Sequence, residues 1–239
     1  MSRPVIRKVN PATLELVGEA ECVLPDEIPQ MVAEARKAQV SWAATPLKER
    51  SRTLRKVQKV LFESTDEISE LVSKETGKPM MESLATDVMN AISVGDFAVE
   101  RMEHAFQESS VDMGNLTLMM RYMGRSSRLM PRPLGVIGVI APWNYPLAIP
   151  YSQTMMCLAA GNGVILKPSS QTPLTALHMR KLMLKAGVPE HLMQVAVGGG
   201  GDVGEALVTS GVDRIIFTGQ ADVGRRIMSL ASPCHMQLK

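Results

Sequence analysis

The segment Leu134–Ala141 constrains the fold more than any other part of this chain of 239 residues, because each of its residues is apolar or glycine. Such a run is typical of a strand that is buried on both faces of a parallel sheet. Strand-like segments follow at 163–166, 193–197 and 214–217, and helical patterns alternate with them at about 147–160, 172–186, 202–210 and 221–231. This alternation predicts an α/β fold with a doubly wound parallel sheet and right-handed crossovers.

The first 110 residues carry helical patterns instead. One helix is expected after Pro25, where acidic residues favour a helix start, and a second after Pro46. Ser64–Glu67 has the S-x-x-E form of a capping box, and Gly77–Pro79 supplies the stop signal for the helix that follows it. A further helical pattern runs from Met80 to about Gln107.

Between these two parts, residues 115–130 alternate with a strand-like period, and Gly124 stands where a hairpin could turn. The predicted division is therefore a helical part over 1–110, a hairpin over 111–132 and a Rossmann-like core over 133–239.

Composition and charge exclude several classes of protein. The 26 Lys and Arg nearly balance the 24 Asp and Glu, and no basic run suggests a nucleic-acid partner. No apolar stretch approaches the roughly 20 residues of a membrane span. The first residues lack the apolar core of a signal peptide, and Cys22, Cys157 and Cys234 are too far apart for a disulfide framework. We expect a soluble, cytoplasmic protein that binds neither nucleic acid nor membrane.

Two glycine loops compete as a phosphate site, because doubly wound sheets bind ligands beyond the carboxyl ends of their strands. Gly199, Gly201 and Gly204 form a literal G-x-G-x-x-G, a weak signal in a run of four glycines. Gly219 and Gly224 flank the start of the last helix, where free N–H groups favour an anion. Either loop implies a nucleotide.

Two polar residues stand at other strand ends. Lys167 directly follows a strand, so its ammonium could reach a ribose hydroxyl or a phosphate, although alone it is an ordinary exposed lysine. Asn144 lies between Pro142 and Pro146, where its amide could donate to a developing oxyanion. An Asx turn is the more ordinary interpretation of an asparagine in such a loop.

Other chemistries lack their motifs. The P-loop pattern is absent, and no tyrosine is followed four residues later by lysine. The four histidines have no metal-ligand spacing, so no metal site is expected. Cys157 lies in an apolar helical stretch, and the neighbours Cys234 and His235 are a poor nucleophile and base pair because sequence neighbours seldom adopt that geometry.

Several short motifs, taken together, resemble those of the NAD(P)-dependent aldehyde dehydrogenases, in the family's order and over nearly the whole chain. They are Asn10–Thr13, Glu75–Pro79, Pro133–Val136, Pro142–Pro146, Lys167–Ser169, Thr172–Leu174, Ala186–Pro189 and Phe217–Gly219. The resemblance implies that a cysteine thiolate attacks an aldehyde, that hydride passes to the nicotinamide, and that a glutamate-activated water releases a carboxylate.

The resemblance also assigns roles to residues. Asn144 matches the oxyanion-stabilising asparagine, which reverses the preference for an Asx turn, and Lys167 matches the lysine that binds the adenosine ribose. Gly219 and Gly224 match the glycines at the pyrophosphate-binding helix, whereas the loop with Gly201 falls nearer the adenine. The complete set expected to bind the cofactor is Ala141, Pro142, Trp143, Lys167, Ser169, Ser170, Gly201, Phe217, Thr218, Gly219, Gln220 and Gly224.

Two departures from the family pattern bear on the cofactor. NAD-preferring members carry a glutamate where this chain has Ser170. Without that carboxylate, no negative charge at this position repels the 2′-phosphate of NADP, so NADP is favoured over NAD. Gln220 replaces a common serine and alters the expected pyrophosphate contact.

The resemblance sets further expectations. The sequence stops at Lys239, about where the family's Leu-Glu-Leu-Gly-Gly segment would begin, so the nucleophilic cysteine and general-base glutamate are expected to be missing and the chain to be inactive alone. Its substrate would be an aldehyde, with a lean to semialdehydes, and the 111–132 hairpin would serve a homo-oligomer. The alternatives are a non-catalytic nucleotide-binding module and a truncated remnant.

Overall fold

The computed structural model describes residues 3–232, and a parallel four-stranded sheet lies at its centre. The strands are β5 (Val136–Ile140), β6 (Gly163–Lys167), β7 (Met193–Val195) and β8 (Arg214–Phe217), in the order β7-β6-β5-β8. All three neighbouring pairs are parallel. The chain moves outward from β5 to β7 and then returns to the other side of β5, so the predicted doubly wound sheet is confirmed.

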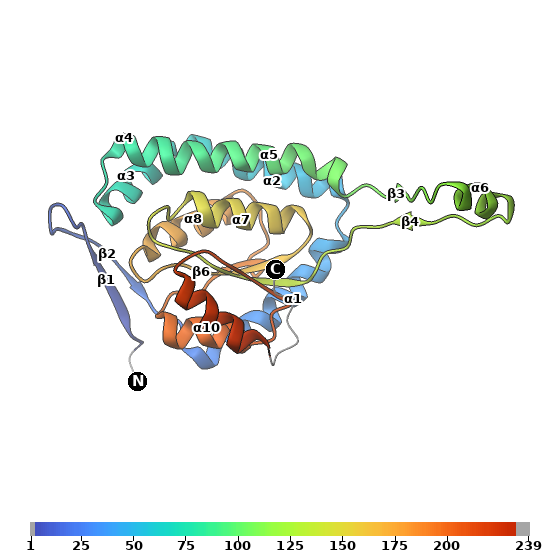
Figure 1. Ribbon diagram of the computed structural model, residues 1–239. Helices are drawn as coiled ribbons and strands as arrows, with labels where there is room; N and C mark the ends of the chain where they lie inside the picture. Colours follow the sequence, from blue (N-terminus) through green and yellow to red (C-terminus); the bar gives the residue numbers. More distant parts are fainter. Residues whose placement is uncertain (1–2, 233–239) are drawn as a thin grey trace.

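Helices cover both faces of this sheet (Figure 1). The first face carries α7 (Ala148–Ala159) and α8 (Pro173–Lys185), and the second carries α1 (Ile28–Ala44), α9 (Glu205–Thr209) and α10 (Ala221–Ala231). Every residue of β5 is buried. Ile137 and Val139 pack into the first core while Val136 and Ile140 pack into the second, because successive side chains of a strand point to opposite faces.

A second helical layer lies over α7 and α8 (Figure 1). It consists of α2 (Leu47–Glu63), α3 (Thr65–Thr76), the short α4 (Met80–Glu82), a π-helical turn over Ser83–Val88 and α5 (Met89–Ala105). A 3-10 turn, Pro25–Glu27, leads into α1. The helices predicted after Pro25, after Pro46 and from Met80 are therefore confirmed.

Two sequence signals were predicted to bound α3, and only the one at its C-terminal end is confirmed. Gly77 adopts a left-handed backbone with φ of 78° and ends the helix, as predicted. The capping box at Ser64 is wrong, since the Ser64 side chain makes no capping hydrogen bond. The Ser64 N–H donates to carbonyls of Val60 and Leu61, so this residue still belongs to the end of α2 and lacks the extended backbone of an N-cap.

The helical prediction for residues 1–110 is wrong at its beginning. Strands β1 (Val5–Val9) and β2 (Leu16–Glu21) form an antiparallel hairpin there. Asn10 closes the turn, with its side chain accepting from the Ala12 N–H at 2.8 Å. β-Branched Val5, Ile6 and Val9 carry the strand signal in a segment too short for a helical period to emerge.

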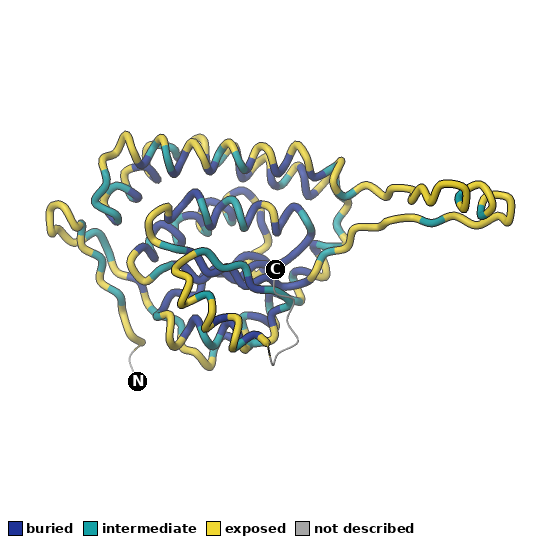
Figure 2. The backbone as a smooth tube through the Cα atoms, in the orientation of Figure 1, coloured by how far each residue is buried: buried dark blue, intermediate teal, exposed yellow. Residues whose placement is uncertain are grey.

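The hairpin predicted over 111–132 is correct only at its base. Strand β3 (Ser109–Ser110) pairs with β4 (Arg128–Leu129), but helix α6 (Asn115–Tyr122) occupies the segment that alternates like a strand. Gly124, with φ of 67°, follows α6 and accommodates the end of that helix rather than a hairpin turn. We call residues 109–129 the arm; it projects from the body and is almost wholly exposed (Figure 2).

A substitution of Gly138, at the centre of β5, would show how tightly the second core is packed. A Cβ there would lie 2.6 Å from Ile215 Cδ1 and 3.3 Å from Leu207 Cγ. Gly138→Ala should therefore lower the free energy of unfolding by about 1–3 kcal/mol, measured by denaturant unfolding. Gly201→Ala is the control, because a Cβ at Gly201 meets nothing within 4 Å. Equal stability of the two variants would contradict this packing.

Candidate functional site

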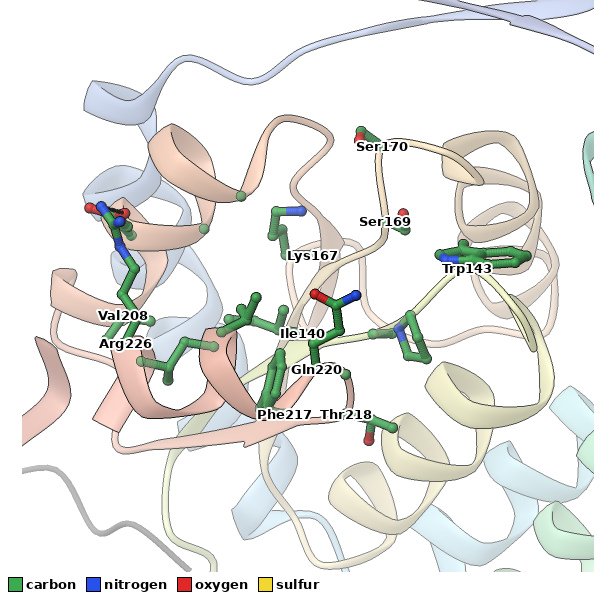
Figure 3. Close-up of a pocket in the computed structure, with 18 of the residues that line it drawn as sticks. Ile140, Trp143, Lys167, Ser169, Ser170, Val208, Phe217, Thr218, Gln220 and Arg226 are labelled. Atoms are coloured by element: carbon green, nitrogen blue, oxygen red, sulfur yellow. Dashed lines mark ion pairs between the residues drawn. The ribbon is translucent and has the colours of Figure 1, made fainter. Parts of the chain in front are cut away.

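A cavity of about 820 Å³ opens at the carboxyl end of the sheet (Figure 3). Ile140, Lys167 and Phe217 end three neighbouring strands side by side, because Ile140 is in register with both of the others. This is the point where the strand order reverses between β5 and β8, which is the usual ligand position in such sheets. The volume lies within the roughly 300–1,000 Å³ typical of small-molecule sites.

Lys167 supplies a buried cation at the centre of the cavity (Figure 3). Its Nζ donates to the carbonyl of Pro168 at 2.9 Å, and its methylene stem lies against Gly204, where a Cβ would be 3.5 Å away. Burial lowers the pKa of Lys167, and the Asp202 carboxylate partly opposes this shift. Within residues 3–232 no ion pair involves Lys167, so the ammonium retains donors for a ligand.

The loop from Ala141 to Leu147 joins β5 to α7 and forms another wall; we call it the Asn144 loop. It continues the sheet at its start, where the Ala141 N–H donates to the Lys167 carbonyl at 3.1 Å. Trp143 and Asn144 are exposed and line the cavity. An Asx turn at Asn144 would need the N–H of residue 146, and Pro146 has none. The Asn144 amide is therefore available to a ligand.

The opposite wall leads into α10. The Thr218 N–H donates to the Ile140 carbonyl at 3.0 Å, and Gln220 precedes the helix without a capping hydrogen bond from its side chain. The first N–H groups of α10 thus remain available beside the cavity, where the helix dipole favours an anion.

Each predicted cofactor-binding residue has a definite place relative to the cavity. All of them line it except Gly201 and Gly224. Gly201 belongs to the π-helical turn over Gly200–Gly204, whose first and last residues do line the cavity. Gly224 packs against Phe217, and a Cβ would lie 3.3 Å from its ring. Its role in the structure is the close approach of α10 to β8.

Sequence reasoning missed the wall formed by α9 and α10. Arg226 and Glu205 form an ion pair of 2.5 Å across it. Val223, Ile227 and Leu230 recur at helical spacing, so the apolar face of the last helix could have identified them. The remaining cavity residues outside the prediction are Ile140, Ile149, Gly200, Gly204 and Val208.

Neither cysteine of the described part has the setting of a nucleophile. Cys157 is buried in α7, and burial raises the pKa of its thiol to about 12. Burial also raises the pKa of Cys22. Neither lines the cavity. Cys234 and His235 lie outside the described residues. Over residues 3–232, no group of three or more His, Cys, Asp or Glu side chains could hold a metal ion, and no helix could span a membrane.

Comparison with known proteins identifies the family of this chain. The aldehyde dehydrogenase family model matches residues 1–238. The chain belongs to the aldehyde dehydrogenase family. It is 34% identical over 229 residues to the mitochondrial succinate-semialdehyde dehydrogenase of Arabidopsis thaliana, covering 95% of this chain and 42% of that protein.

Two solved structures extend this comparison to coenzymes. An NADP-dependent enzyme of E. coli aligns with a TM-score of 0.89 and 29% identity over 98% of this chain and 47% of its own. An aldehyde dehydrogenase of Bacillus cereus, solved as its NAD+ complex, aligns with a TM-score of 0.89 and 26% identity, covering 98% and 46%. The chain therefore spans less than half the length of each of these three relatives.

The cavity's own chemistry fits a dinucleotide. Its apolar wall of Val208, Phe217 and Ile227 suits a flat ring, the Lys167 ammonium suits ribose hydroxyls, and the start of α10 suits a diphosphate.

Lys167 should make coenzyme binding depend on pH. The ammonium is charged only below its folded-state pKa, which lies below the ordinary 10.5, so affinity for NADP should fall as pH rises through that lowered value. Lys167→Met should weaken binding about tenfold or more and abolish this alkaline dependence, as measured by calorimetric titration. The variant should unfold at no lower temperature, because burial disfavours the charged lysine. An unchanged affinity would remove Lys167 from the site.

Proposed function

We propose that this chain forms the coenzyme-binding part of an NAD(P)-dependent aldehyde dehydrogenase and supplies its oxyanion-stabilising asparagine. One observation carries the proposal: Lys167, the Asn144 amide and the start of α10 converge on one cavity at the switch point of the sheet. Membership of the family supports aldehyde oxidation as the reaction of the complete enzyme.

The proposed coenzyme contacts follow from the chemistry of the walls. Lys167 and Ser169 would donate to the adenosine ribose, while the first amides of α10, beside Gly219 and Gln220, would hold the diphosphate. Ala141, Pro142 and Trp143 would flank the coenzyme on the side of the Asn144 loop. When bound, the nicotinamide supplies a hydride acceptor.

Asn144 would act on the aldehyde itself. Its side-chain amide would donate a hydrogen bond to the carbonyl oxygen of the aldehyde as negative charge develops there. We propose that the attacking thiolate comes from a residue other than those described, because Cys22 and Cys157 have raised pKa values and lie outside the cavity lining. The same observation favours the second candidate function, a non-catalytic nucleotide-binding module.

Ser170 supports NADP as the coenzyme. It is exposed at the cavity wall and carries no charge that would repel a 2′-phosphate. As substrate we propose a semialdehyde, supported by the succinate-semialdehyde dehydrogenase relative. A cytoplasmic location completes the proposal, since Cys22 and Cys157 are free thiols.

The arm supports a homo-oligomer. Its exposed apolar side chains include Leu116, Leu118 and Tyr122, the last 95% exposed, and clusters of exposed apolar side chains mark interaction sites. We propose a second copy of the chain as the partner.

A charge at Ser170 tests the proposed function. Ser170→Glu should weaken NADP binding about tenfold or more in calorimetric titration, because the carboxylate repels the 2′-phosphate, while NAD binding should be retained or strengthened. Gln171→Glu places the same charge on the next residue, outside the cavity lining, and should change the NADP affinity much less. Tighter binding of NAD than of NADP by the unaltered chain would refute the preference, and binding of neither would refute the proposed function.

Charges on the arm test the oligomer. Leu118→Asp combined with Tyr122→Asp should shift sedimentation toward the monomer while each chain stays folded, because both side chains are exposed in the single chain. Val40→Asp is the control, since Val40 is a comparably exposed residue on the body. A monomeric unaltered chain, or an oligomer that survives both arm charges, would disprove assembly through the arm.

A further inference from the structure

The motif Glu75–Pro79 has no place in the coenzyme cavity, yet two of its charged side chains reach the helices that follow the cavity loops. The buried Glu75 carboxylate accepts hydrogen bonds from the Leu174 N–H at 2.7 Å and from the Thr175 N–H at 2.8 Å. It therefore fixes the first turn of α8, directly after the loop that carries Ser170. Lys78 extends in the same way toward the loop that precedes α7.

Lys78 contacts the Asn144 loop directly. Its Nζ donates to the backbone carbonyl of Asn144 at 2.9 Å and lies 4.9 Å from the centre of the Tyr145 ring. The lysine side chain is only 12% exposed, so water screens these interactions little. One cation thus holds two consecutive residues of the loop.

Asp87 holds the other end of the same loop. Its Oδ2 accepts from Lys78 Nζ at 2.8 Å, and its Oδ1 accepts from the N–H groups of Leu147 and Ala148, each at 3.2 Å. The Asp87 side chain is fully buried and sits in the π-helical turn over Ser83–Val88, a kind of irregular turn that often marks a functional position. Its carboxylate also meets the positive end of α7.

We infer that the buried Lys78–Asp87 pair is a positioning pair that holds the backbone of the Asn144 loop and so fixes the point from which the Asn144 amide projects. The contacts of the pair are independent of the proposed function, whereas the use of the Asn144 amide rests on it. Asn144 is exposed, and within residues 3–232 no hydrogen bond restrains its side-chain amide. The backbone therefore sets where this side chain starts and which rotamers are open to it, and Lys78 and Asp87 hold that backbone on both sides of Pro146.

Such a restraint matters for oxyanion stabilisation. A hydrogen-bond donor assists the reaction only when it already points at the position the charged oxygen will occupy. A loop free to move would present the amide in many directions, and each productive encounter would first have to restrain it. Neither Lys78 nor Asp87 lines the cavity, so the pair acts through the loop.

Hydrogen exchange of the loop tests the inference without coenzyme. Lys78→Met alone would leave the Asp87 charge buried without its partner and could prevent folding. The variant of choice is therefore Lys78→Met combined with Asp87→Asn, which removes both charges and keeps an acceptor oxygen for Leu147 and Ala148. Mass spectrometry of peptides that span residues 143–148 should show exchange about tenfold or more faster than in the unaltered chain.

Arg36→Met is the control. It removes the ion pair between Arg36 and Asp213, of 2.8 Å, at the opposite end of β5, and should leave exchange over 143–148 unchanged. Faster exchange confined to the Asn144 loop in the double variant would support the positioning role. Unchanged exchange there would overturn it, and so would an equal increase in β5 and β6, which would indicate a general loss of stability.

Coenzyme titration separates this inference from the proposed function. The double variant should bind NADP within about twofold of the unaltered chain, because the loop residues that the pair contacts, Asn144, Tyr145, Leu147 and Ala148, are not among those proposed to hold the coenzyme. A much larger loss of affinity would mean that the pair supports the whole cavity and would overturn the specific role toward Asn144. If the unaltered chain bound no dinucleotide, only the proposed function would fail, since the exchange result stands without it.

Discussion

The cavity depends on backbone hydrogen bonds that continue past the ends of the strands. Ala141 donates to Lys167 beyond the end of β5, and Thr218 donates to Ile140 beyond the end of β8. These two bonds bring the first residues of both loops to one edge, where parallel strands already place their carboxyl ends together. The loops therefore diverge only after Ala141 and Thr218, and the cavity opens between them. The side chains on the walls act on a ligand only because this edge is fixed first.

The outer helical layer completes what the sheet begins. Glu75 and Asp87 are buried carboxylates from that layer, and each accepts hydrogen bonds from the first N–H groups of a helix next to the sheet. The same helix end favours negative charge electrostatically. For Glu75, burial raises the pKa while the hydrogen bonds from Thr175 and Leu174 lower it, with burial the larger effect. Both carboxylates are thus held by hydrogen bonds from helix N-termini that form only when the chain is folded.

Periodicity was sufficient to predict the sheet but not its surroundings. The apolar run at Leu134–Ala141 and the alternating helices predicted a doubly wound parallel sheet. A strand that is buried on both faces shows no alternation of polar and apolar residues, and such strands are typical of parallel sheets. The strand prediction for Asn115–Tyr122 was wrong, because the short alternation of apolar residues in this segment fits a strand and one face of a helix equally well. Most predicted site residues follow strand ends, so a local pattern is enough to propose them. Asp87 lies 60 residues before Leu147, and no local pattern connects the two. Gly224 matched a motif, yet its observed contact is with the Phe217 ring.

The π-helical turn that carries Asp87 has a consequence for recombination among relatives. A π turn adds a residue to the helical repeat and so shifts every side chain after it around the axis of α5. A chimera that joined residues 133–232 to the helical layer of a relative with a regular helix here would turn the carboxylate away from α7. The two halves of such a hybrid could each keep their own sequence patterns and still leave the start of α7 without its acceptor. Exchangeable units in this fold are therefore set by helix phase as well as by sequence boundaries.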